Sequence, residues 1–227
     1  MTRIIQGINF FRDNIFGAKK SLFEQLREGQ RPLALFITCA DSRIDPNLLT
    51  QTQPGELFVH RNAGNLIPPF GAPPNGEAAG IEYAVQHLAV RDIIICGHSQ
   101  CGAMHGVMNL SALGSMTSVA DWLQFASPCV DRARSRIPGS EGSELFQAVI
   151  EQNVLVQMEH LKTYPFVQQA ASDGRLRLHA WVYHFERGEI MAYDSSEDRF
   201  VSLPEATRHK LLVPLDLPEA IPDQASS

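Results

Sequence analysis

The stretch Leu33-Ala34-Leu35-Phe36-Ile37-Thr38-Cys39-Ala40-Asp41-Ser42-Arg43 decides the fold, because an apolar run ends there in side chains that carry chemistry. The apolar run is typical of a strand buried in a parallel sheet. Cys39, Asp41 and Arg43 then offer a thiolate, a carboxylate and a guanidinium at the tip of that strand. Open parallel sheets place their functional groups at such carboxyl ends.

A second buried strand is predicted over residues 92–97, and it runs into Gly97-His98-Ser99-Gln100-Cys101-Gly102. If the two strands are neighbours, His98 and Cys101 meet Cys39. Two thiolates and one imidazole would form a three-ligand zinc site with one position left open, as catalytic zinc requires. The alternative is a buried thiol pair beside a histidine that bonds a backbone carbonyl. Cys96 and Cys129 fit that alternative and are left out of the site.

Asp41 has two interpretations that the residues leave open. If Asp41 bound zinc, the site would have four protein ligands and would be closed. If Arg43 pairs with Asp41, the carboxylate is held off the metal and could accept the hydrogen bond of a zinc-bound hydroxide. The simpler alternative is a loop salt bridge that only stiffens the turn.

Length and composition describe an ordinary globular protein. A chain of 227 residues suits one domain, and a net charge of −6 with no block of like charge disfavours nucleic acid and anionic membranes as partners. No apolar run is long enough for a signal sequence or a membrane-spanning helix. We therefore expect a cytoplasmic protein with reduced cysteines. The expected division is a catalytic domain over residues 1–205, which includes an N-terminal helical arm (1–30), and a C-terminal tail (206–227).

The order of predicted elements indicates an α/β fold: a mainly parallel β-sheet with an antiparallel edge strand, flanking helices and the N-terminal helical arm. The arm is predicted as helix over 3–28, broken near Gly17. A second strand covers 56–60, and residues 176–183 and 189–193 are predicted to form a hairpin. Further helices are predicted near 47–49 and over 77–88, 102–110, 119–125 and 143–164, with Pro165 ending the last.

Three motifs in order, Cys39–Arg43, Arg61-Asn62-Ala63-Gly64-Asn65 and Gly97–Gly102, make the chain resemble the β-class carbonic anhydrases over nearly its whole length. The similarity is to the plant-like branch, which includes cyanobacterial and other bacterial enzymes. It implies reversible hydration of carbon dioxide to bicarbonate and a proton by zinc-bound hydroxide. It also implies a single zinc ion in each subunit, held by Cys39, His98 and Cys101, with Asp41 and Arg43 as the catalytic dyad.

The same resemblance implies how carbon dioxide and bicarbonate are held. Gln30 would reach the substrate across a dimer interface, and the Gly102 amide would contact bicarbonate. His87 would be a proton shuttle, although by itself it is expected on a helix surface, and His105 is a looser candidate. The apolar wall of the pocket would be formed by Phe58, Ala63 and Tyr83.

Phe36 stands where some relatives have a tryptophan that binds bicarbonate in a closed site, so we predict an open site with Asp41 paired to Arg43. The resemblance implies a homodimer through the N-terminal arms, with a tetramer or larger assembly left open. Carboxysome proteins as partners, and a carboxysomal location, are left open without support. Two other functions stay under consideration: a hydrolase of COS or CS₂ from the same family, and a non-catalytic scaffold subunit stabilised by zinc.

Overall fold

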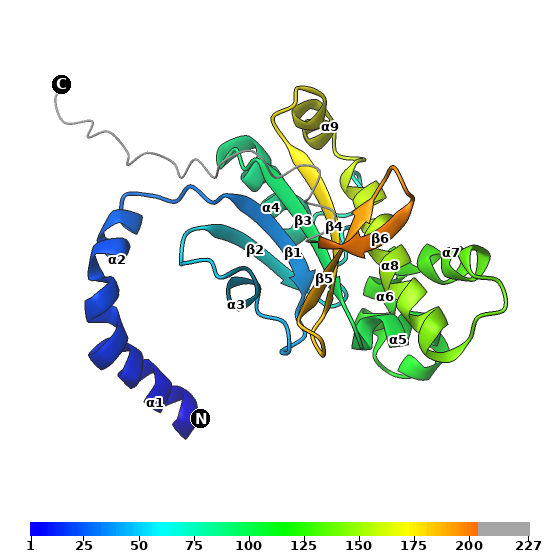
Figure 1. The fold of residues 1–227 in the computed structure, drawn as a ribbon, viewed down its shortest axis with the longest axis horizontal. Coiled ribbons are helices and arrows are strands. Elements are labelled where there is room, and N and C mark those ends of the chain that lie inside the picture. The colour runs from blue at the N-terminus through cyan, green and yellow to red at the C-terminus, as the bar shows by residue number, and fades with distance from the viewer. Residues whose placement is uncertain (204–227) are drawn as a thin grey trace.

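A six-stranded sheet organises residues 1–203, the part of the chain that the computed structural model describes (Figure 1). The strands lie in the order β2-β1-β3-β4-β5-β6. The first four are parallel, whereas β5 and β6 run antiparallel at one edge. Their bounds are β1 Ala34–Cys39, β2 Leu57–Asn62, β3 Asp92–His98, β4 Arg177–His184, β5 Glu189–Asp194 and β6 Arg199–Ser202. The predicted fold class is confirmed, and β6 is an additional edge strand that the sequence did not reveal.

β1 lies between β2 and β3 and is buried along its whole length. Successive side chains point to opposite faces of a strand. Leu35 and Ile37 pack on the face that the helices cover, while Phe36 packs with Ile44 and Ile94 on the other face. Burial on both faces explains why this strand reads as a continuous apolar run.

Helices cover the sheet and connect its strands. α8 is the longest, and it packs against α7, β3 and β4 (Figure 1). α4 continues into a π-helical turn at Tyr83–His87. The helices that follow the arm are α3 Pro46–Thr50, α4 Gly76–Glu82, α5 Gly102–Met108, α6 Thr117–Leu123, α7 Pro128–Arg136, α8 Gly142–Leu161 and α9 Pro165–Ser172. None of the helices in residues 1–203 is long and apolar enough to cross a membrane.

The prediction that Pro165 ends a helix was wrong. α8 ends at Leu161, and Pro165 is the first residue of α9. Proline suits a first helical position because its missing N–H would have no partner there. α7 also begins at a proline, Pro128, and was not predicted as a separate helix.

The N-terminal arm projects away from the sheet (Figure 1). It comprises α1 Thr2–Phe10, a π-helical stretch Phe11–Ile15, a 3-10 turn Phe16–Lys19 and α2 Lys20–Leu26, so the predicted break near Gly17 is present. Ile4, Ile8 and Phe10 remain more than half exposed. An isolated helix of this kind normally depends on a covered apolar face for its stability. The predicted tail, 206–227, lies outside the described residues.

Candidate metal centre

Three potential metal ligands meet where β1 and β3 end. Cys39 is the last residue of β1, His98 is the last residue of β3, and Cys101 directly precedes α5. β1 and β3 are parallel neighbours, so their carboxyl ends lie at the same edge of the sheet. The two sulfur atoms are 3.9 Å apart, and all three donor atoms lie within 4.8 Å of one another. All three residues are buried.

His98 presents one ring nitrogen to this cluster without a partner. Its Nδ1 lies 2.8 Å from the carbonyl oxygen of Ser99, which requires Nδ1 to donate and leaves Nε2 with a lone pair. Nε2 is buried and has no hydrogen-bond partner within residues 1–203. A buried polar atom without a partner is costly, and a metal ion would satisfy this one. Two sulfur donors and an imidazole nitrogen suit zinc.

The two cysteines differ strongly in how readily they ionise. The hydrogen bond from Cys101, helped by the Gly64 N–H at 3.4 Å, lowers the pKa of Cys39 to about 4. The Cys39 thiolate and burial together raise the pKa of Cys101. The pair therefore keeps one proton between two sulfurs in the absence of a cation. A divalent cation would displace that proton, because thiolates are the metal-binding form.

Asp41 lies beside the cluster but is held by Arg43. The Arg43 Nε and Nη2 atoms donate to the two carboxylate oxygens at 2.9 and 2.7 Å, and the Arg43 backbone N–H donates at 3.0 Å. This side-chain pairing keeps the pKa of Asp41 well below its usual range. Asp41 Oδ2 is 3.9 Å from His98 Nε2. An ionised carboxylate, able only to accept hydrogen bonds, therefore faces the position that a metal would occupy.

Arg61 fixes the backbone of this loop and was not singled out from the sequence as a functional residue. Its Nε donates to the Cys39 carbonyl at 3.1 Å, and its Nη2 donates to the Asp41 carbonyl at 2.7 Å. One guanidinium thus joins the end of β2 to the turn that carries the thiolate and the carboxylate. The only signal in the sequence was its place in the Arg61–Asn65 motif.

Buried polar side chains of α8 hold the segment after β2. Asn153 donates to the Gly64 carbonyl at 3.0 Å, and the Gln157 amide oxygen accepts from the Ile67 N–H at 2.8 Å. Both side chains are almost completely buried. The segment they hold brings the Gly64 N–H to the Cys39 sulfur. The sequence did not reveal these residues either, because the residues around a buried glutamine or asparagine do not indicate which distant group it will hydrogen-bond.

The predicted substrate residues fall into two groups within one chain. Gly102 follows Cys101, and Ala63 precedes Gly64, so both belong to the segments that form the metal centre. Phe58 pairs with Leu35, four residues before Cys39, which places it about 13 Å back along the strands. The Phe58 and Tyr83 rings contact each other with centroids 5.9 Å apart. Gln30 precedes β1 altogether, at the amino end of the strands.

The two histidines considered as shuttles are also placed. The His87 ring stacks on Tyr83 with centroids 4.7 Å apart, so it belongs to the Phe58–Tyr83 patch and not to its own chain's metal centre. His105 lies on α5, one turn after Cys101, and its ring stacks on Phe146 at 3.8 Å. Both rings therefore stack on aromatic side chains that do not belong to the three-ligand cluster.

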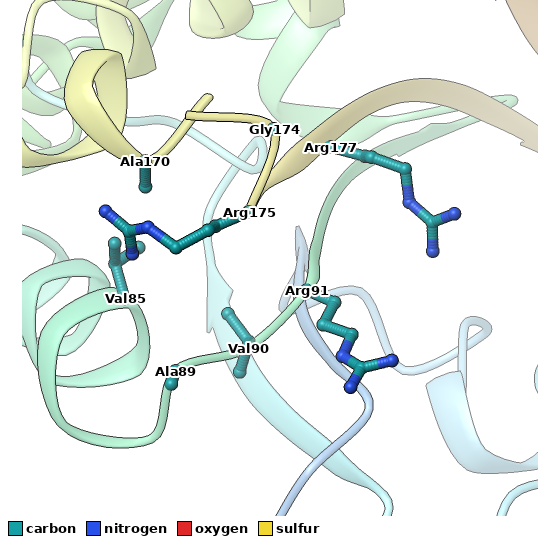
Figure 2. A pocket seen from close by; sticks show the side chains of 8 residues that line it. All are labelled: Val85, Ala89, Val90, Arg91, Ala170, Gly174, Arg175 and Arg177. Atoms are coloured by element: carbon teal, nitrogen blue, oxygen red, sulfur yellow. The ribbon is translucent and has the colours of Figure 1, made fainter. Parts of the chain in front are cut away.

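A hollow of about 450 Å³ lies away from the metal centre, at the amino ends of β3 and β4 (Figure 2). The Arg175 side chain extends between Val85 and Ala170. Three arginines line the hollow. Two of them are already paired with carboxylates, Arg175 with Asp173 and Arg177 with Asp92. The hollow is lined by Val85, Ala89, Val90, Arg91, Ala170, Gly174, Arg175 and Arg177.

Comparisons with known proteins agree with this geometry. A family model described as carbonic anhydrase matches residues 34–190. A carbonic anhydrase of Synechococcus elongatus is 47% identical over 87% of this chain and 74% of its own length. The solved β-carbonic anhydrase CcaA is 44% identical, with a TM-score of 0.86 over 89% of this chain and 91% of its own. A solved tetrameric β-carbonic anhydrase from Sordaria macrospora is 27% identical, with a TM-score of 0.76 over 84% and 95%.

Proposed function

Because the chain belongs to the β-carbonic anhydrase family, we propose that it catalyses the reversible hydration of carbon dioxide to bicarbonate and a proton, with zinc as its resident metal. One observation carries the proposal. The unpartnered Nε2 of His98 and the sulfurs of Cys39 and Cys101 converge beside a carboxylate that Arg43 holds. A purely structural zinc site has no need of an acid kept free of the metal.

In this proposal Cys39, His98 and Cys101 hold the ion. Zinc, when bound, supplies a Lewis acid that makes water a nucleophile near neutral pH. Asp41 stays ionised, accepts a hydrogen bond from the attacking water and so orients it toward carbon dioxide. Arg43 keeps the carboxylate from binding the metal, because both carboxylate oxygens accept hydrogen bonds from the guanidinium.

We further propose that two subunits complete each other's pockets. Gln30, Phe58 and Tyr83 lie too far from Cys39 of their own chain to contact its substrate, so we assign them to the site of the other subunit. His87, stacked on Tyr83, would go with them. The exposed apolar residues of the arm support dimerisation, and the Sordaria macrospora relatives are tetrameric. The Gly102 amide and Ala63 would contact the substrate within the same chain.

The decisive experiment combines metal analysis with stopped-flow measurement of carbon dioxide hydration. We expect stoichiometric zinc, and we expect Asp41→Asn to lower kcat/KM by about 100-fold or more while zinc content and the unfolding temperature stay unchanged. Asp45→Asn is the matched control, because Asp45 only caps α3 and asparagine caps equally well.

Each outcome has a separate meaning. Wild-type protein without zinc or without hydration activity would refute the proposed function and favour the scaffold alternative. Full activity in Asp41→Asn would refute only the role of the dyad. A parallel assay with COS on the same preparation tests the alternative hydrolase activity.

A further inference from the structure

The Arg43 guanidinium lies under an aromatic ring from a distant part of the chain. Its Cζ atom is 4.6 Å from the centroid of the Phe185 ring, within the range of a cation–π contact. The Arg43 side chain is 46% exposed, so water competes with Asp41 for its N–H groups. The pairing with Asp41 therefore needs additional support, and the ring is placed to give it.

Phe185 lies in the turn between β4 and β5, and this turn is fastened to the metal-ligand loop. The Phe185 N–H donates to Ser99 Oγ at 3.3 Å, and that hydroxyl donates to the Glu186 carboxylate. The Ser99 N–H donates to the Tyr183 carbonyl at 2.9 Å. Ser99 also accepts the hydrogen bond from His98. The turn that carries the ring thus has a fixed position relative to the imidazole.

If Arg43 moved away, the Asp41 carboxylate could bind the metal instead. Its Oδ2 atom is 3.9 Å from His98 Nε2, so a small displacement would bring it within bonding distance of an ion held by the three ligands. Arg43 and the metal therefore compete for the same carboxylate. Besides Asp41, two contacts favour Arg43 in its observed position: the Gln100 carbonyl, which accepts from Nη2 at 2.9 Å, and the Phe185 ring.

We propose that Phe185 is a positioning residue for the hydration reaction, holding Arg43 so that Asp41 stays off the metal and the fourth coordination position stays free for water. The inference rests on the proposed function in needing a metal at this site. The Phe185 ring is proposed to act on the carboxylate through Arg43. The same ring also lies beside the His98 ring, with ring centroids 6.4 Å apart, and an effect through that contact would persist without Asp41.

The test is azide binding to the cobalt(II)-substituted protein, followed by the visible absorption of the metal. Azide needs the free position, so its apparent Kd reports whether Asp41 has taken that position. We expect Phe185→Leu, which keeps apolar volume but removes the π face, to raise the azide Kd by about threefold to thirtyfold. Phe185→Trp keeps the ring and should leave the Kd near the wild-type value. Phe185→Met replaces the leucine variant if that variant does not fold.

A double-mutant comparison shows whether the effect passes through Asp41. In an Asp41→Ala background no carboxylate competes, so adding Phe185→Leu should leave the azide Kd unchanged. The inference is overturned if Phe185→Leu alone binds azide like the wild type, or if it weakens azide binding equally without Asp41. Cobalt and azide binding with the expected pattern, but without any hydration of carbon dioxide, would refute the proposed function and leave only the effect of Phe185 on Arg43 and Asp41 standing.

Discussion

Gln157→Leu should destabilise the protein more than any ordinary substitution on the same helix. The Gln157 side chain is fully buried on α8 and makes three hydrogen bonds. Its amide oxygen accepts from the Ile67 N–H at 2.8 Å, and its amide nitrogen donates to the Phe125 carbonyl at 3.1 Å and to Asn153 Oδ1 at 3.0 Å. Leucine has nearly the same volume but can replace none of these bonds.

The expected loss of stability follows from the buried hydrogen-bonding groups that lose their partner in Gln157→Leu. A buried donor such as the Ile67 N–H costs about 1–3 kcal/mol when its partner is removed, and each of the other two bonds adds about 1 kcal/mol. The free energy of unfolding should therefore fall by about 3–5 kcal/mol, a large part of the roughly 5–15 kcal/mol typical of a domain. In urea unfolding followed by circular dichroism, the midpoint should fall by about 1–2 M.

Gln152→Leu is the matched control. Gln152 lies on α8 and is 7% exposed, but it borders a small cavity and makes no side-chain hydrogen bond in the part of the chain that the structure describes. Its substitution should cost less than about 1 kcal/mol. Equal losses in the two variants would show that helix α8 does not hold the 64–67 segment through Gln157, and the reasoning would be refuted.

Two further predictions concern a helical glycine and two partly buried histidines. Gly80→Ala should lower the unfolding temperature, because a Cβ there would lie 1.8 Å from the His60 ring, and the overpacking cost of about 1–3 kcal/mol exceeds the gain in helix propensity. Gly76→Ala, with open space around it, is the control, and an unchanged temperature in both variants would contradict the packing. Burial lowers the pKa of His60 and of His160, so both stay neutral in the fold and the unfolded chain binds more protons below about pH 6.5. The stability that the two neutral histidines contribute is thus present above that pH and is lost as pH falls. Urea unfolding between pH 5.5 and 7.5 should show the free energy of unfolding decreasing toward low pH, and this decrease should be shallower in His160→Gln. Equal decreases in the variant and the wild type would contradict the prediction.

The sequence predicted the cluster of Cys39, His98 and Cys101 better than its surroundings. Cys39 and His98 could be placed because each follows an apolar strand, and parallel neighbours bring such ends together. Phe185 and Gln157 could not be found this way, since their roles depend on contacts with residues far away in the sequence. The local pattern of a turn aromatic or a helical glutamine is the same whether or not such a partner exists.

The same limit explains the errors in the fold. β6 is only four residues long and follows a turn, so its pattern was too weak to distinguish it from a loop. Pro165 was interpreted only as a helix terminator, whereas proline also begins helices. The helical arm and the mainly parallel sheet were predictable because their apolar patterns are long and regular.

Cys39 and Cys101 are 62 residues apart, and the intervening chain contains α3, β2, α4 and β3. An ion held by both sulfurs would therefore be a reversible cross-link that closes a loop containing most of the parallel sheet. A disulfide would close the same loop, but it would need an oxidant to form. Unlike the ligands of a compact finger, these cannot capture an ion before strands distant in sequence have come together. Metal loading of this chain would thus depend on the completion of its core.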